Sequence, residues 1–123
     1  MNKIPERRKH VRIKTPYYIT RFRVKPYDDM VSKDLDTVAA FNLNAGGIFF
    51  YSRTNLEVGT ILDLKIGFSH YYPTIICVGK VIRAKRYQAI SIYGYSVEFT
   101  EIDELNKIMI NKSLEMTEWQ QKL

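Results

Sequence analysis

Cysteine and histidine are scarce in this sequence. Cys77 is the only cysteine, which excludes an intramolecular disulfide and a zinc site built from cysteines, and it favours a reducing compartment. Its apolar neighbours predict a small core side chain. His10 and His70 are the only histidines, and no Cys/His/Asp cluster has the spacing of metal ligands. We therefore expect no metal and no cofactor.

Catalytic motifs and long apolar runs are also missing. The sequence has no Ser/His/Asp arrangement, no phosphate-binding loop and no dinucleotide-binding glycine pattern, so we expect no enzyme. No apolar stretch approaches the roughly 20 residues of a membrane helix. The basic N-terminus lacks the apolar segment of a signal peptide. These absences predict a protein of the cytoplasm that does not insert into a membrane.

Acidic residues are nearly absent from the first fourteen positions, which hold six basic residues and only Glu6. This segment therefore has a net charge of +5, out of +6 for the whole chain of 123 residues. The rest of the chain is almost neutral. Because the segment also lacks apolar periodicity, it predicts a flexible basic arm over residues 1–14 that binds a phosphate.

Alternating apolar residues, many of them aromatic or β-branched, predict six short strands after the arm. The predicted ranges are 17–24, 37–42, 47–52, 61–68, 74–86 and 88–100. Strands at this spacing predict a mainly β fold, a six-stranded antiparallel β-barrel over residues 15–101. Asp103 then predicts the cap of a C-terminal α-helix over residues 102–123. Its apolar stripe would pack on the barrel through Leu105, Met109, Met116, Trp119 and Leu123.

Three arginines in the arm form the first candidate binding motif. Arg8 and Arg12 are four residues apart, and Arg7 lies beside them. The planar guanidinium makes two parallel hydrogen bonds to a phosphate, and its face also stacks on a nucleobase. Taken alone, the same run also fits a solvated, non-specific basic patch.

A second candidate motif lies at the end of a predicted strand. Asn42 and Asn44 are two residues apart, so in an extended chain their amides point the same way. Gly47 has no Cβ and lets a ligand approach the backbone. The same residues also fit an ordinary Asn/Gly hairpin turn.

The two motifs together resemble the signatures of the PilZ domain family, RxxxR followed after about thirty residues by [D/N]xSxxG. Arg8 and Arg12 match the first signature. Asn42, Asn44 and Gly47 match the second, except that Asn44 stands where the family has Ser. The resemblance covers about residues 6–114. It implies a PilZ-like split barrel and a receptor for the bacterial second messenger cyclic di-GMP.

The resemblance also implies roles for these residues. Arg8 and Arg12 would grip phosphate and stack on, or hydrogen-bond to, guanine. Asn42 and Asn44 would read guanine or ribose edges from the barrel surface. Gly47 would keep that surface open.

The family also suggests a stoichiometry and a mode of signalling. Arg7 occupies a position that influences whether one nucleotide or a stacked pair is bound, and an arginine there favours the pair. Ligand binding would fold the arm over the barrel. The new surface would then signal to a separate effector protein or through a homodimer.

Two other functions remain open. The first is a degenerate PilZ adaptor that acts through protein contacts without nucleotide, which Asn44 in place of Ser supports. The second is a small barrel that binds single-stranded nucleic acid by stacking bases on the aromatic residues 49–51. The charge is concentrated in the arm, whereas a nucleic-acid track needs it spread along the barrel. Arg83 and Arg86 fit either a positive rim or a plain exposed face.

Overall fold

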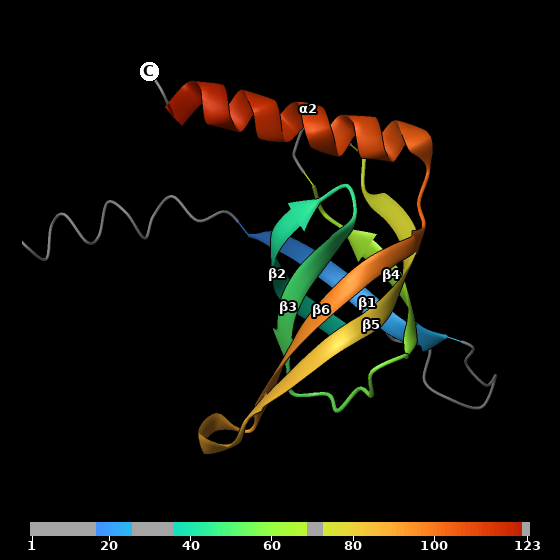
Figure 1. The fold of residues 1–123 in the computed structure, drawn as a ribbon, viewed down its shortest axis with the longest axis vertical. Coiled ribbons are helices and arrows are strands. Elements are labelled where there is room, and N and C mark those ends of the chain that lie inside the picture. Colours follow the sequence, from blue (N-terminus) through green and yellow to red (C-terminus); the bar gives the residue numbers. More distant parts are fainter. Residues whose placement is uncertain (1–16, 26–35, 69–72, 122–123) are drawn as a thin grey trace, which may run out of the picture.

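Six strands and one long helix make up the fold (Figure 1). The computed structural model describes residues 17–25, 36–68 and 73–121, with side chains up to residue 114. The predicted arm therefore lies outside the described residues. The elements are β1 (Tyr18–Lys25), β2 (Asp36–Asn44), β3 (Gly47–Ser52), β4 (Ile61–Ile66), β5 (Ile75–Tyr87), the 3-10 turn η1 (Gln88–Ile90), β6 (Ile92–Glu101) and α2 (Glu104–Gln121).

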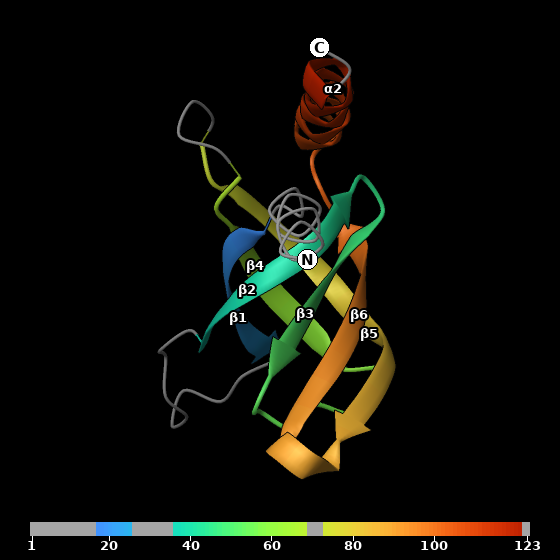
Figure 2. The same ribbon diagram turned by 90° about the vertical axis from the view of Figure 1, so that its left-hand side faces the viewer.

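The strands close into an antiparallel barrel in the order β1-β2-β3-β6-β5-β4, with β4 pairing back to β1. This confirms the predicted six-stranded barrel, and Figure 2 shows α2 lying at one of its ends. The alternation of side chains produces the core. In β4, Leu62, Leu64 and Ile66 are fully buried, while Asp63 and Lys65 between them point outward.

Aromatic rings fill the barrel. Phe22 and Phe50 stack inside it with ring centroids 5.0 Å apart. The expectation that residues 49–51 all stack bases on the surface was therefore wrong for Phe50, which is fully buried. Tyr95 is also buried, and its hydroxyl accepts a hydrogen bond from Leu56 N and donates one to Thr54 O, both 2.7 Å long. These bonds fix the loop between β3 and β4 to the core.

Cys77 is a core residue, as its apolar neighbours predict. It is buried and unpaired. Burial raises the pKa of its thiol to about 12, because a buried thiolate loses its hydration. The side chain therefore remains a neutral thiol at physiological pH.

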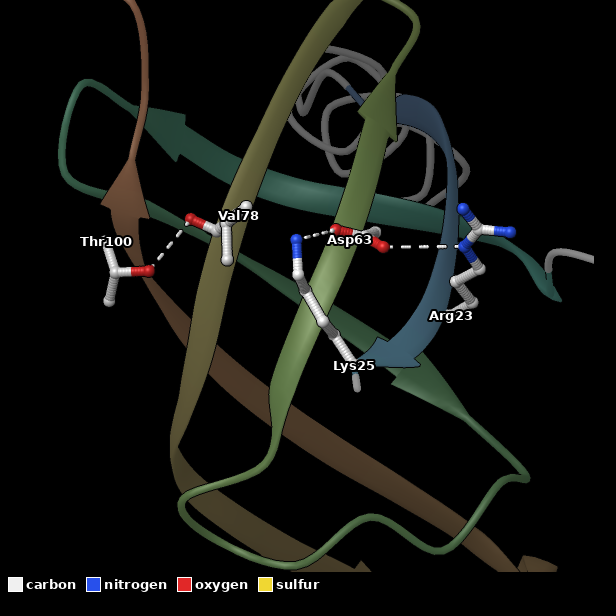
Figure 3. Close-up of polar contacts among 5 residues, drawn as sticks. All are labelled: Arg23, Lys25, Asp63, Val78 and Thr100. Atoms are coloured by element: carbon white, nitrogen blue, oxygen red, sulfur yellow. Dashed lines mark hydrogen bonds and ion pairs between the residues drawn. The ribbon is translucent and has the colours of Figure 1, made fainter. Parts of the chain in front are cut away.

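Polar contacts on the outside cross the seam where β1 meets β4 (Figure 3). Asp63 of β4 accepts from Arg23 Nε at 3.4 Å and from Lys25 Nζ at 3.3 Å, both on β1. Exposed ion pairs of this kind contribute about 0–1 kcal/mol each. The closure of the barrel therefore rests on the backbone ladder and on the buried side chains.

The helix α2 packs on the barrel through only part of the predicted stripe, since Met109 contacts the core and Leu105 does not. Ile110 is fully buried, and Met109 and Leu114 pack against the barrel core. Leu105, the first residue of the predicted stripe, is 75% exposed. Leu105 and Ile110 are five residues apart, about 140° around an α-helix, so the face that buries Ile110 leaves Leu105 pointing outward. The remaining predicted residues, Met116, Trp119 and Leu123, lie outside the described side chains.

The connection between β5 and β6 also differs from the prediction of a tight turn and a strand from residue 88. Gln88–Ile90 forms a 3-10 turn, and Ser91 adopts a left-handed conformation with φ of 54°. The strand β6 starts only at Ile92. Local propensity gives little warning of this, because Ala, Ile and Ser occur in both conformations.

Candidate ligand-binding site

The turn between β2 and β3 is built around one asparagine side chain. Asn44 Oδ1 accepts hydrogen bonds from the backbone N–H groups of Gly46, at 2.7 Å, and of Gly47, at 3.1 Å. Such an Asx turn replaces backbone hydrogen bonds that the strand ends would otherwise lack. The Gly46 carbonyl in turn accepts from Phe99 N of β6 at 2.9 Å. The turn is therefore held by its own side chain and by the neighbouring strand.

Gly47 faces the backbone of β6. A Cβ built on Gly47 would overlap the carbonyl oxygen of Val97. The barrel itself therefore requires glycine at this position, because β3 and β6 approach closely there. The contact of Gly47 with a ligand stays a prediction.

Asn42 lies within β2, but its backbone is not extended as expected. It has φ of 55°, and the register between β2 and β3 shifts between Phe41 and Asn44. The expectation of an extended chain from Asn42 to Asn44 was therefore wrong. Asparagine tolerates the left-handed conformation better than most residues. Because the shift turns both Phe41 and Asn42 outward, Asn42 and Asn44 nevertheless line the same pocket.

This pocket has a volume of about 350 Å³, which lies within the range of small-molecule sites. It is shared by β2, β3, β5 and β6. Its polar and apolar walls include Asn42, Asn44, Phe49, Ile82, Ser96 and Glu98.

Sequence reasoning missed Ser96 and Glu98 as pocket residues. The pairing of β3 with β6 brings them there, since Gly47 lies opposite Glu98 and Phe49 opposite Ser96. The two strands are not consecutive in the chain, so no local pattern indicates the contact.

The pocket offers hydrogen-bonding groups of both kinds. Among the described residues, no hydrogen bond uses Asn44 Nδ2 or the side chains of Asn42 and Ser96. Asn44 Nδ2 therefore presents two N–H donors, and Glu98 presents carboxylate acceptors. A ligand with acceptors and donors along one edge, such as a purine base, suits this arrangement.

The described residues form no second pocket that contains the residues of the two candidate motifs. A hollow of about 380 Å³ lies near Asp36 and Arg53, and there the Thr54 hydroxyl already donates to Asp36 Oδ2 at 2.9 Å. No three His, Cys, Asp or Glu side chains in the described ranges gather as metal ligands would. None of the helices described is long and apolar enough to span a membrane.

The role of Asn44 in the turn leads to a prediction. Replacement of Asn44 by alanine removes both turn bonds and is expected to lower the free energy of unfolding by about 1–2 kcal/mol. Asn44→Ser is expected to lose less than half as much, because a serine hydroxyl also accepts from turn N–H groups. Urea unfolding followed by circular dichroism measures both values. Equal losses in the two variants would show that the turn bonds do not set the stability of this region.

The fold and the pocket together define a small β-barrel binding domain. The model of the PilZ domain family matches residues 6–115, and the chain belongs to this family. PilZ domains form a family of cyclic di-GMP receptors, and they bind ligands or adapt proteins rather than catalyse reactions. The arginines Arg7, Arg8 and Arg12 lie outside the described residues, so their roles stay predictions.

Comparison with other proteins agrees with this assignment. No curated protein matches the chain in sequence. The solved structure of the Bacillus subtilis inhibitor of motility (MotI/DgrA), a PilZ-domain protein, is similar with a TM-score of 0.65 at 15% identity. The match covers 86% of this chain and 47% of that one, so the chain spans about half the length of that neighbour. The likeness shows the shared fold.

Proposed function

We propose that this chain is a receptor for cyclic di-GMP that signals through a partner protein. The observation that carries the proposal is the pocket lined by Asn42 and Asn44, beside the start of β1. The ring centroid of Tyr17, the first described residue, lies 6.4 Å from that of Phe41, which directly precedes Asn42. The predicted arm therefore joins the barrel close to the pocket.

The length of the arm allows its arginines to reach a ligand there. Arg12 precedes Tyr17 by five residues and Arg8 precedes it by nine. An extended chain spans at most about 3.6 Å per residue, which gives limits of about 18 Å and about 32 Å from Tyr17. Both limits exceed the distance across a pair of neighbouring strands. The length of the arm therefore does not prevent either arginine from reaching a ligand in the pocket.

The chemistry of cyclic di-GMP matches the two groups of residues. Its two phosphates suit the guanidinium forks of Arg8 and Arg12. The O6 and N7 acceptors of a guanine suit the amide donors of Asn42 and Asn44. The guanine N1–H and N2–H donors suit the carboxylate of Glu98.

Binding would become a signal through the arm. A bound dianion offsets the mutual repulsion of the arm arginines and favours an arm ordered over the barrel. The surface so formed would contact an effector protein or a second copy of the chain. Because cyclic di-GMP acts inside bacterial cells, the proposal places the protein in the cytoplasm of a bacterium.

Isothermal titration of the full chain with cyclic di-GMP tests the proposal. We expect saturable binding that an excess of GTP does not compete away, with two nucleotides per chain if Arg7 favours the stacked pair. Absence of heat with correctly folded protein, confirmed by a cooperative thermal transition, would overturn the receptor proposal.

The second candidate is an adaptor that binds protein without nucleotide. It is favoured by the use of Asn44 Oδ1 in the turn, which leaves this amide only its donors for a ligand. A binder of single-stranded nucleic acid is less favoured, because Phe50 is buried and cannot stack a base. A failed titration with cyclic di-GMP would make the adaptor the leading candidate.

A further inference from the structure

The hairpin of β5 and β6 extends beyond the rest of the barrel. From Ile75 to Val81 the side chains of β5 alternate between buried and exposed or partly exposed, but from Ile82 to Arg86 every residue is exposed. The partner strand β4 reaches only to Lys80 in the register. Figures 1 and 2 show the turn of this hairpin at the end of the molecule opposite α2. Residues 83–93 form what we term the hairpin extension.

Residue types in the hairpin extension change in order from its tip toward the barrel. Ile90, in the turn, is 61% exposed. Tyr87 follows on β5 and is half-buried, whereas Tyr93 on β6 lies opposite Arg86 and packs against the barrel core. Lys85 and Arg86 follow within two residues, or about 7 Å of strand. Along β5 the order is therefore apolar, then aromatic, then cationic.

The charge of the hairpin extension has one sign. No acidic residue occurs between Lys80 and Glu98. Within the described residues, Arg83, Lys85 and Arg86 form no ion pair.

The cations lie against aromatic rings. Lys85 Nζ lies 5.1 Å from the ring centroid of Tyr87, and the guanidinium carbon of Arg86 lies 5.9 Å from that of Tyr93. Lys85 and Arg86 are neighbours in a strand, so they project from opposite faces of the hairpin. The positive charge therefore lies on both faces of the hairpin, behind the apolar tip.

We propose that the hairpin extension docks on an anionic lipid surface. Ile90 would enter the headgroup boundary, the Tyr87 ring would lie at the interface, and Lys85 and Arg86 would meet the lipid phosphates. This is the order in which apolar, aromatic and cationic side chains distribute across a membrane surface. A nucleic acid backbone would instead favour cations along one face. The proposal is independent of the proposed nucleotide site, whose turn lies toward α2 (Figure 1).

Vesicle sedimentation with the full chain tests this proposal. Vesicles of phosphatidylcholine are compared with vesicles of equal parts phosphatidylcholine and phosphatidylglycerol. We expect binding only to the anionic vesicles, weakened by added salt. Lys85→Gln with Arg86→Gln is expected to weaken the partition about fivefold for each cation removed. Ile90→Ser is expected to weaken it by a similar factor, because a serine gains little from the apolar boundary.

Matched controls separate the hairpin extension from general effects. Ile76→Ser removes an isoleucine of similar exposure, 65%, from the part of β5 that pairs with β4. Lys65→Gln with Lys112→Gln removes the same charge from other exposed positions. Both controls are expected to bind vesicles as the unaltered chain does.

Five outcomes would overturn the proposal. They are equal binding by the hairpin variants and the unaltered chain, absence of binding to anionic vesicles, and a loss confined to variants of the arm arginines. The fourth is a Lys85/Arg86 variant that loses binding because it oligomerises in size-exclusion chromatography. That result would assign the cations to protecting the free edge of β5. Binding of a DNA oligonucleotide that depends on the same residues, without vesicle binding, would assign the surface to nucleic acid.

Discussion

Replacement of Arg8 and Arg12 together by alanine is expected to weaken cyclic di-GMP binding at least about a hundredfold. Hydrogen bonds to charged groups contribute about 1.5–3 kcal/mol each, so the loss of both arginines removes about 3–6 kcal/mol. A hundredfold change requires only about 2.7 kcal/mol. The free energy of unfolding is expected to change by less than about 0.5 kcal/mol, since both residues precede the barrel. Titration calorimetry and urea unfolding measure the two quantities.

The control for this variant removes the same charge elsewhere. Arg53 and Lys112 are exposed on the barrel side and on α2, away from the pocket. Arg53→Ala with Lys112→Ala is expected to change the affinity less than about threefold at physiological salt, where screening is strong. If both double variants weaken binding alike, attraction is non-specific and the two arginines have no special role. Unchanged affinity in the Arg8/Arg12 variant would exclude the arm from the site.

Replacement of Gly47 by alanine is expected to cause the largest loss of stability, about 3 kcal/mol. The added methyl group would overlap the carbonyl oxygen of Val97, which belongs to the paired backbone of β6 and cannot move alone. Relief requires β3 and β6 to separate where the turn and the pocket meet. We expect the melting temperature to fall by about 10 °C in a domain of this size.

The adjacent glycine provides the control. A Cβ at Gly46 would lie 3.3 Å from Asn44 Oδ1, a side-chain atom that can shift slightly. Gly46→Ala is therefore expected to cost less than about 1 kcal/mol. Urea unfolding of both variants gives the comparison. A Gly47→Ala variant as stable as Gly46→Ala would show that β3 and β6 are less tightly paired here than the structure indicates.

Much of the fold is predictable because its strands obey simple alternation. The strand predicted at 61–68 follows directly from apolar residues at every second position, and it forms as Ile61–Ile66. The start of β6 is not predictable in this way, because the left-handed Ser91 ends a turn of ordinary composition. The buried face of α2 is also hidden from periodicity. Leu105 and Ile110 are both apolar, and the sequence pattern alone does not show that Ile110 is the buried one.

The candidate site is also predictable only in part from the sequence. Asn42, Asn44 and Gly47 are adjacent in sequence, and their motif locates one wall of the pocket. The sequence does not show that Asn44 holds the turn, since that depends on its side-chain conformation. Glu98 reaches the pocket only through pairing between strands about fifty residues apart. Contacts between residues so far apart in the chain can be predicted only when the order of the strands in the barrel is known.

The strand β1 has a neighbour on each side, β2 and β4. We therefore expect a conformational change upstream of Tyr17 to leave β1 in place, because the strand is hydrogen-bonded along both edges. The barrel then keeps its shape, and the signal to a partner comes from the segments attached to the barrel. Substitutions in those segments can then change the output of the protein without lowering the stability of the barrel.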